Sequence, residues 1–396
     1  MADPAPPGSN LRMSAALFLI GFATFSLIYC TQPLLPVFST EFGISPATSS
    51  LSISLTTGFL AVSILCAGAG SEVLGRRGLM AASIGVAAVL NVLCAVAPSW
   101  TVLLILRAAE GFALGGVPAV AMAYIAEEVP APLLGRVMGL YVGGTAFGGM
   151  AGRVAIGALA GLFSWRVAIG GVALLDLAAA LAFAVLLPSS RHFVRRPGLN
   201  LRDHLSAWSG HLRHEKLGLL FLTGFLAMSA FVTVYNYAGF RLAAPPYGLD
   251  EAQIGLIFFA YVFGVVASPT AGMWALRIGR GPMLVIGAAT GAAGLALTLL
   301  APLLLIVAGV CLVTIGFFVI HSVASGAVSQ LALRNTGHAT SLYLLAYYAG
   351  SSVMGSFGGA VWRQGGWTAV VAYCLLMLVG VAAAGTRLSR QVKHGA

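Results

Sequence analysis

The chain has 396 residues, of which 59% are hydrophobic and only 8% are Asp, Glu, Lys or Arg. A soluble globular protein carries about 25% charged residues, so this composition excludes a soluble protein. A membrane-spanning helix takes about 20 apolar residues, and a chain of this length can hold about a dozen of them with short loops. The composition therefore predicts an all-α membrane protein with many spans.

The formal net charge is +10, but the basic residues do not cluster on a soluble segment with interleaved aromatic residues, so no nucleic-acid partner is expected. The five cysteines all lie in apolar runs, which predicts small buried side chains and neither disulfides nor a zinc site. The sequence has no nucleotide-binding loop and no zinc-protease or serine-hydrolase motif. We therefore expect no cofactor, no metal and no enzymatic activity.

The first half of the chain is predicted to hold six spans. Residues 1–13, which include three prolines, are expected to form a cytoplasmic tail. Apolar runs broken by Gly, Pro and charged residues then predict a six-helix unit over residues 14–187. Its spans cover residues 14–37, 48–68, 79–97, 101–124, 135–161 and 166–187.

The basic segment 188–216 is predicted to be a cytoplasmic linker. A charged, solvated tether is the preferred interpretation of this segment. Residues 199–212 nevertheless have the spacing of an amphipathic helix that would lie on the membrane surface. The apolar face of that helix would consist of Leu201, Leu205, Trp208 and Leu212.

Six further spans are predicted in a second half over residues 217–387, followed by a cytoplasmic tail at 388–396. They cover residues 217–243, 252–272, 282–301, 303–328, 338–361 and 368–387. The sequence thus predicts twelve transmembrane helices in two six-helix halves.

The distribution of basic residues predicts the orientation in the membrane. An even number of spans places both termini on one side, and cytoplasmic loops are enriched in Lys and Arg. Of the 21 Lys and Arg residues, 16 fall on the side of the termini and the linker, and three fall on the opposite side: Arg166, Arg241 and Arg363. The remaining two lie within spans. We therefore expect both termini in the cytoplasm.

The two halves repeat each other in sequence. The turn after span two reads Gly68-Ala-Gly-Ser-Glu72-Val73-Leu-Gly75-Arg76-Arg77. The turn after span eight matches it 204 residues later and reads Gly272-Met-Trp-Ala-Leu276-Arg277-Ile-Gly279-Arg280. Spans five and eleven share a second set of residues, shifted by 202. Two parallel six-helix halves around a midplane cavity are typical of transporters whose halves rock to alternate access.

These motifs resemble the major facilitator superfamily. The first turn is similar to the loop signature of that family, with Glu72 in place of the usual Asp and Val73 in place of the usual base. The segment Leu106-Arg107-Ala-Ala-Glu110-Gly111 resembles its fourth-helix arginine motif. The Gly-rich run that ends at Arg153 resembles the fifth helix of its antiporters, with Arg153 in place of the usual proline.

The resemblance covers nearly the whole chain and implies a gating role for the two repeated turns. Glu72 would pair with an arginine of a neighbouring helix in only one access state. The alternative is a plain topology anchor, in which Arg76, Arg77 and Arg280 lie among anionic headgroups. Gly75 and Gly279 would let the chain reverse at each helix end.

Four ionisable residues are predicted to lie inside spans, where charge is expensive and marks a pathway or an ion pair: Arg107, Glu110, Arg153 and Asp176. A rise of about 1.5 Å per residue places the first three at a common depth. We expect both guanidiniums around Glu110, which would suit an anionic substrate or a proton switch; a closed structural cluster is the alternative. Asp176 has no partner in its own span, so it is either a proton carrier or a protonated carboxyl hydrogen-bonded between helices.

Polar residues in the first span of each half are candidates for the substrate cavity. Tyr29 and Gln32 precede two prolines that should break the first span and expose carbonyls to the cavity. Tyr235 and Asn236 lie at a comparable depth in span seven. Substrate contact and aromatic anchoring at the membrane interface are both possible roles. His321 in span ten is either a cavity residue or a packing residue with one interhelical hydrogen bond.

The sequence thus predicts a secondary active transporter. The resemblance implies a monomer that exports a small solute, such as a drug or a sugar, in exchange for protons. The alternative is uptake of an organic anion together with protons, with Arg107 and Arg153 as the recognition groups. The expected partners are a small-molecule substrate, protons and membrane lipids. A receptor that does not transport is disfavoured, because the chain has no appended signalling domain and such a receptor would not need charges inside its spans.

Overall fold

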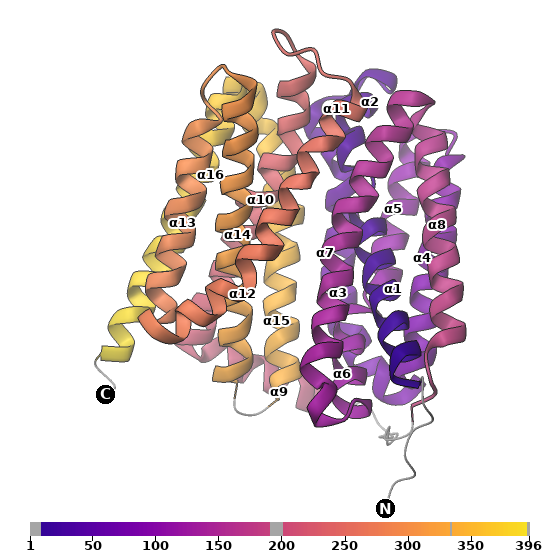
Figure 1. Ribbon diagram of the computed structural model, residues 1–396, viewed down its shortest axis with the longest axis vertical. Coiled ribbons are helices and arrows are strands. Elements are labelled where there is room, and N and C mark those ends of the chain that lie inside the picture. Colours follow the sequence, from indigo (N-terminus) through magenta and orange to yellow (C-terminus); the bar gives the residue numbers. More distant parts are fainter. Residues whose placement is uncertain (1–8, 191–200, 333–334, 394–396) are drawn as a thin grey trace, which may run out of the picture.

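The computed structural model describes residues 9–190, 201–332 and 335–393, apart from the side chains of residues 9–10, 68–70, 72–74, 119, 131, 201 and 391–393. Within those ranges the regular elements are all helices (Figure 1). The N-terminal half contains α1 (Ser9–Tyr29), η1 (Gln32–Leu34), α2 (Leu35–Glu41), α3 (Pro46–Leu74), α4 (Arg76–Ala95), α5 (Trp100–Leu114), α6 (Pro118–Glu128), α7 (Ala131–Leu162) and α8 (Trp165–Leu186).

The C-terminal half follows a short surface helix, α9 (Leu201–Arg213). It contains α10 (Glu215–Ala243), α11 (Glu251–Gly255), η2 (Leu256–Ala260), α12 (Tyr261–Ile278), α13 (Arg280–Leu297), α14 (Leu303–Leu331), α15 (Thr336–Ala349), η3 (Gly350–Met354) and α16 (Gly355–Lys393). The alternative interpretation of the linker, a helix, is therefore correct for residues 201–213, and the preferred interpretation as a solvated tether is wrong there. Residues 191–200 lie outside the described part of the chain.

Ten stretches of the described chain are long and apolar enough to cross a membrane. One of them, Thr336–Arg390, is 55 residues long and reverses at Gly365 and Gly366, whose backbone angles are not helical, so it holds two spans. A further span consists of α5 and α6, which are each too short alone and are joined by a turn around Gly116. The predicted twelve-span fold in two six-helix halves is confirmed.

Local sequence explains where several helices begin. Ser45, Ser99 and Ser164 precede α3, α5 and α8, and each serine hydroxyl accepts a hydrogen bond from the backbone N–H three residues later. This is the usual way to satisfy a free N–H at a helix start. Gly75 and Gly279 end α3 and α12 with φ of 87° and 95°, a region that favours glycine, so the repeated turns have the same backbone.

Glycines allow α1 and α7 to pack closely. A Cβ at Gly144 or Gly148 of α7 would overlap the backbone of Phe18 or Phe22 of α1. Gly350, at the equivalent position of the second half, lies in the same way against the backbone of Phe225 in α10. The Gly-rich runs therefore allow close approach of the helix backbones in both halves.

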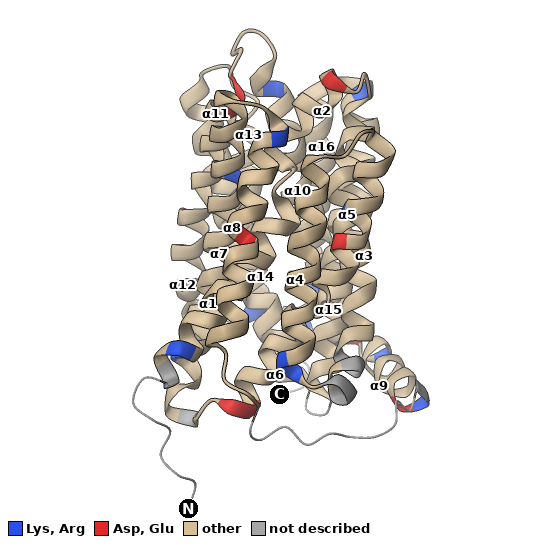
Figure 2. Cartoon of the chain, turned by 90° about the vertical axis from the view of Figure 1, so that its right-hand side faces the viewer, with Lys and Arg blue, Asp and Glu red and all other residues tan. Residues whose placement is uncertain are grey.

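Both the beginning of α1 and the end of α16 lie at the same end of the molecule, together with α9 (Figure 1). We call this the basic end, because the turn with Arg76 and Arg77 and most of the other basic residues belong to it. Charged residues gather at the two ends, with few between them (Figure 2).

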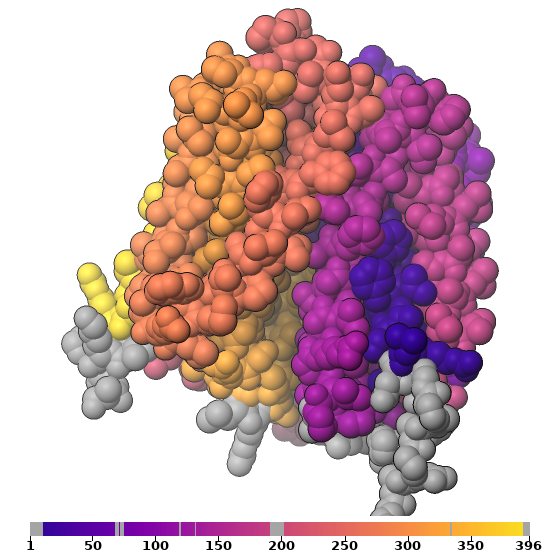
Figure 3. Space-filling view, in the orientation of Figure 1, coloured from indigo at the N-terminus to yellow at the C-terminus, as the bar shows by residue number. Residues whose placement is uncertain are grey.

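The two halves touch at the end opposite the basic end. There Gly157 of α7 lies against Gly255 of α11, and Ala47 of α3 lies against Gly359 of α16. Towards the basic end, the space-filling view shows the surface hollowed between the two halves, with atoms of α15 at the back of the recess (Figure 3). On this face the halves therefore touch at one end and separate towards the basic end, while α15 packs against α3 behind the recess.

Candidate transport site

Arg107 of α5 is fully buried inside the N-terminal half. Its Nη1 lies 2.6 Å from Glu110 Oε2, the ion pair that the i, i+3 spacing predicts. It also donates to the carbonyls of Leu27 at 3.0 Å and Ile28 at 2.7 Å, and its Nε donates to Ser52 O at 3.1 Å. Because α1 ends just after Leu27 and Ile28, these carbonyls have no partner within the helix. Arg107 donates to both of these carbonyls and so satisfies them.

Two buried carboxyl groups flank α1, and each has one oxygen without a hydrogen-bond partner. In Glu110 this atom is Oε1, and in Asp176 of α8 it is Oδ1. Asp176 Oδ2 accepts a hydrogen bond from Ser26 of α1 at 2.8 Å, so Asp176 has one interhelical partner. An ionised carboxylate with an unsatisfied oxygen is unfavourable in an apolar interior, whereas a bound proton removes its charge. Both groups can therefore serve as proton acceptors.

Arg153 of α7 does not join this cluster, so the expectation of two guanidiniums around Glu110 is wrong. Its Nε donates to Gln32 Oε1 at 2.7 Å and its Nη1 donates to Gly149 O at 2.5 Å. The guanidinium carbon lies 4.2, 4.9 and 5.1 Å from the ring centroids of Tyr29, Tyr261 and Phe258. Tyr261 and Phe258 belong to the C-terminal half, so Arg153 faces the contact between the halves.

The first spans of the two halves also meet at this contact. Gln32 Nε2 donates to Asn236 Oδ1 at 2.7 Å. Gln32 follows α1 and Asn236 lies in α10, so this hydrogen bond joins the first spans of the two halves directly. Asn236 Nδ2 and the Tyr29 hydroxyl are both buried without a partner. Gln32 thus connects Arg153 of one half to Asn236 of the other.

Aromatic side chains form the C-terminal side of the contact. The Tyr235 hydroxyl lies 2.8 Å from Thr314 Oγ1, and the Tyr235 ring stacks on Phe258 at 5.1 Å between centroids. His321 Nδ1 lies 2.9 Å from the Tyr343 hydroxyl. His321 therefore has the single interhelical hydrogen bond of the packing alternative.

The sequence interpretation missed Phe258, Tyr261 and Tyr347. Phe258 and Tyr261 lie beside Arg153, and the Tyr347 ring lies 4.9 Å from the His321 ring. In sequence they are ordinary aromatic members of apolar spans. The only available signal was the polar tip of the two tyrosines, which seeks a partner when it is buried.

The first repeated turn holds an ion pair that was not expected. Arg76 Nη2 lies 2.8 Å from Glu127 Oε1 of α6, and Arg76 also contacts Ser71. Arg77 donates to Ser189 Oγ at 3.0 Å and to Ala184 O at 2.8 Å, at the end of α8. These arginines are therefore bound to protein groups as well as lying near the membrane surface. Gly68 and Glu72 lie in the last turns of α3, and the Glu72 side chain is outside the described part of the structure.

The second repeated turn has no acidic partner among the described residues. Arg280 donates to Gln330 of α14, and the Arg277 guanidinium lies 5.6 Å from the Trp274 ring centroid. Gly272 lies within α12 beside open space. The first turn is thus held by an ion pair and the second by a neutral amide.

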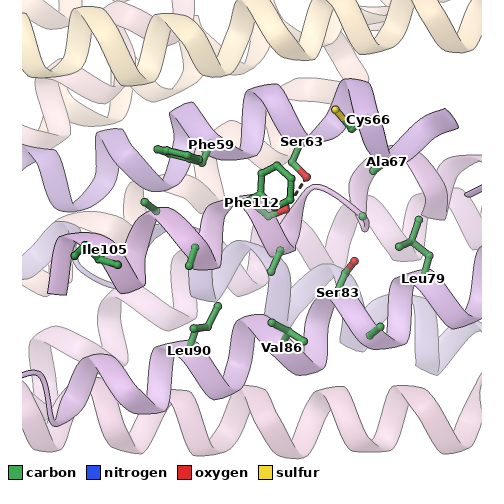
Figure 4. Close-up of a pocket in the computed structure, with 15 residues that line it drawn as sticks. Phe59, Ser63, Cys66, Ala67, Leu79, Ser83, Val86, Leu90, Ile105 and Phe112 are labelled. Atoms are coloured by element: carbon green, nitrogen blue, oxygen red, sulfur yellow. Dashed lines mark hydrogen bonds between the residues drawn. The ribbon is translucent and has the colours of Figure 1, made fainter. Parts of the chain in front are cut away.

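A pocket of about 910 Å³ lies elsewhere, between α3, α4 and α5 (Figure 4). Its lining is almost entirely apolar and opens at the outside of the N-terminal half, where Phe59 and Phe112 are exposed. Cys66 faces this pocket and is exposed, so the prediction that every cysteine is buried is wrong for Cys66. Because the pocket contains no charged group and no residue of the C-terminal half, the transport site is better placed at the contact between the halves.

Two six-helix halves that meet around a buried polar contact define a polytopic secondary transporter. The family model of the Major Facilitator Superfamily matches residues 17–245, and the chain belongs to this family. It is 43% identical over 382 residues to the inner membrane transport protein YnfM of Escherichia coli (strain K12), which covers 96% of this chain and 91% of YnfM. It is 41% identical over 382 residues to the MFS-type transporter YybF of Bacillus subtilis (strain 168), covering 96% and 94%.

Solved structures show the same fold. A bacterial homologue of the human lysosomal transporter Spinster, in an inward-facing and occupied conformation, matches with a TM-score of 0.78 and 15% identity over 98% of each chain. The nucleoside transporter NupG matches with a TM-score of 0.78 and 13% identity over 96% of this chain and 99% of NupG. The protein is therefore a multi-pass membrane transporter of small molecules and not an enzyme.

Proposed function

We propose that this transporter exports a small organic solute in exchange for protons. The observation that carries the proposal is the pair of buried carboxyl groups, Glu110 and Asp176, each with one unsatisfied oxygen. Acidic side chains in the membrane interior are rare and serve as proton relays in transporters. Both groups are fully buried, so a proton gained or lost there changes the charge of the N-terminal half.

Arg107 provides the connection from the proton acceptors to the solute. It binds Glu110 and the carbonyls of Leu27 and Ile28 at the end of α1, and Tyr29 and Gln32 follow directly in sequence. Protonation of Glu110 removes the charge that pairs with Arg107, which releases Arg107 to shift the end of α1. The contact that Gln32 makes with the C-terminal half then changes with the protonation of Glu110.

We place the basic end in the cytoplasm of a bacterial inner membrane, because Lys and Arg are enriched in cytoplasmic loops. Both termini and α9 are then cytoplasmic. The closed contact between Gly157 and Gly255 is on the outer side, and the recess between the halves faces inward. Both sides of the transport site come from one chain, so a monomer suffices, surrounded by membrane lipids.

Uptake of an organic anion together with a proton is the second candidate. Arg153 favours it, because this guanidinium is 2% exposed and has no ion pair within the described residues. Arg107 was expected to share this role, but its bonds to Glu110 and to three backbone carbonyls leave it inside the N-terminal half.

The test uses proteoliposomes that contain the purified protein and a pH-sensitive dye. A proton gradient is imposed, and sugars, organic anions and cationic drugs are added in turn. Proton movement opposite to the solute establishes exchange, and proton movement with the solute establishes symport. Transport of a solute with no proton movement would contradict proton coupling for both candidates.

A further inference from the structure

Arg153 has no counter-charge within the part of the chain that the structure describes. The described ion pairs join Arg76 to Glu127, Arg107 to Glu110, Arg166 to Glu41 and Arg387 to Glu215. Asp176 binds Ser26 inside the N-terminal half, and Glu72 lies at the other end of the membrane, in the last turn of α3. No ion pair therefore involves Arg153 among the residues that the structure describes.

The C-terminal half has no acidic residue in the interior of its membrane spans; Glu215 and Glu251 stand at the first positions of α10 and α11. Asp250 and Glu251 stand at the start of α11, at the closed end of the molecule, and no Asp or Glu follows them in the sequence. The position equivalent to Arg153 in the second half is Gly355, 202 residues later, so the charge is not mirrored there. The contact between the halves thus has one buried cation and no anion. A guanidinium stays charged in proteins, and a buried charge without a partner is strongly unfavourable.

Two buried polar groups near Arg153 have no partner. Asn236 Nδ2, a donor, belongs to the side chain that binds Gln32, and the Tyr29 hydroxyl, which can donate or accept, belongs to the ring beside the guanidinium. Gln32 Oε1 is already used by Arg153, and Asn236 Oδ1 is used by Gln32. A ligand that satisfies this site must bring acceptor atoms, and a carboxylate or a phosphate brings both acceptors and negative charge.

Aromatic rings form the rest of the site. Tyr29, Phe258 and Tyr261 surround the guanidinium, and Tyr235 stacks on Phe258. The faces of these rings partly stabilise the Arg153 guanidinium while the two halves are in contact at this site. When the halves separate, rings from both halves become available to a flat apolar group. A cationic solute would be repelled by the positive charge of Arg153.

We infer that the solute is an aromatic organic anion, whose carboxylate or phosphate pairs with Arg153 and accepts from Asn236 and Tyr29, while its ring packs against the tyrosines of both halves. The inference rests on the proposed transport role of this contact. It narrows the solute from the drug or sugar class that the family resemblance implies. It does not depend on the direction of transport.

The test compares probes that share one ring system and differ in charge. Purified full-length protein in detergent is titrated at neutral pH with 1-naphthylacetate, 1-naphthylmethylamine and 1-naphthylmethanol, and with benzoate, benzylamine and benzyl alcohol. Binding is followed by thermal stabilisation. We expect the anion of at least one set to bind about tenfold more tightly than its amine and alcohol, the scale of one charge-assisted contact.

Substitutions of Arg153 test whether this residue causes the preference for the anion. Arg153→Gln is expected to abolish the preference for the anion, and Arg153→Lys to retain a weaker preference, because Lys keeps the charge but not the planar donor fork. Arg166→Gln is the matched control, because Arg166 is 40% exposed and pairs with Glu41 at the closed end. It should leave the preference unchanged.

The inference is overturned if no anion binds, if the amine or alcohol binds as tightly as the anion, or if folded Arg153→Gln keeps the preference. If Arg153→Gln does not fold, the order in which the unsubstituted protein and Arg153→Lys bind the anion, the amine and the alcohol still tests the inference. Transport assays separate the two proposals. Proton flux driven only by the amine or the alcohol would contradict an anionic solute but support proton coupling. Transport of the anion without proton flux would support an anionic solute but contradict proton coupling.

Discussion

Arg107 and Arg166 both form ion pairs, but their surroundings differ. The Arg107 pair is fully buried, whereas the Arg166 and Glu41 side chains are 40% and 43% exposed. Arg107→Ala leaves a buried carboxylate and the end of α1 unpaired, so we expect a loss of about 3–5 kcal/mol in stability. Arg166→Ala should cost about 0–1 kcal/mol. Thermal unfolding of both variants in detergent measures the difference, and equal stability would contradict the capping role of Arg107.

Glu110→Gln tests the proton acceptor without removing its bulk. The amide can still accept a hydrogen bond from Arg107, so the end of α1 should remain in place. We expect proton-driven transport to stop and exchange of solute for solute to continue. Counterflow and pH measurements in the same proteoliposomes distinguish the two activities. Glu41→Gln is the control, and full proton-driven transport by Glu110→Gln would remove Glu110 from the mechanism.

For single residues, the sequence predicted the partner of Arg107 but not that of Arg153. Arg107 and Glu110 lie on one helix, and a spacing of three residues places them together whatever the fold. Arg153 and Arg107 both lie beside the end of α1, but the direction of Arg153 around the axis of α7 depends on how the helices pack. No local rule supplies that rotation, so its position beside Gln32 and Tyr261 could not be predicted.

The packing of α7 against α1 depends on which glycine is substituted. A Cβ at Gly148 would overlap the backbone of Phe22, whereas a Cβ at Gly143 of the same helix meets nothing within 4 Å. We expect Gly148→Ala to destabilise by about 1–3 kcal/mol through overpacking. Gly143→Ala should be neutral or stabilising by up to about 1 kcal/mol, because alanine favours helices. Thermal unfolding compares the two, and equal effects would contradict the packing role.

The helix α9 is held to α15 by a pair of histidines. His204 Nδ1 lies 2.7 Å from His338 Nε2, so one ring must donate and the other accept. His338→Ala removes this hydrogen bond, and we expect α9 to detach from α15 in that variant.

Hydrogen exchange of the amides in residues 201–213 measures this attachment. Loss of protection is expected in His338→Ala. Ser341→Ala, on the same helix, should keep the protection, because that hydroxyl bonds within α15 to Gly337 O. Unchanged protection in His338→Ala would show that the histidine pair does not hold α9.

Among the elements, long apolar runs were predicted well and interruptions were not. The span at Trp165–Leu186 matches its predicted bounds to within one residue at each end. The break between α5 and α6 was missed, because Gly115 and Gly116 lie inside an uninterrupted apolar run. The charge of the linker favoured a solvated tether and outweighed the helical spacing of its leucines, although that spacing proved decisive for α9.

For the molecule as a whole, rocking of the halves predicts that a cross-link between them stops transport. Ser54 and Ser356 belong to different halves, and their hydroxyl oxygens are 2.6 Å apart. A disulfide needs about 2.0 Å between its sulfur atoms, so Ser54→Cys with Ser356→Cys should form one under oxidation. Cys66 is replaced in the background, because it is exposed.

We expect oxidation to stop transport by the double variant and a reductant to restore it. Each single cysteine variant serves as a control and should remain active in both conditions. Continued transport with the disulfide shown to be present would contradict rocking of the halves at this contact.

The hydrogen bond between Gln32 and Asn236 has a consequence for the protein when it carries no solute. It joins the two halves, and both side chains are buried. Separating the halves at this contact leaves both amides without a partner, which is unfavourable unless water or a solute replaces the lost bond. This contact therefore acts as a latch that favours the arrangement described here until a replacement partner enters between the halves.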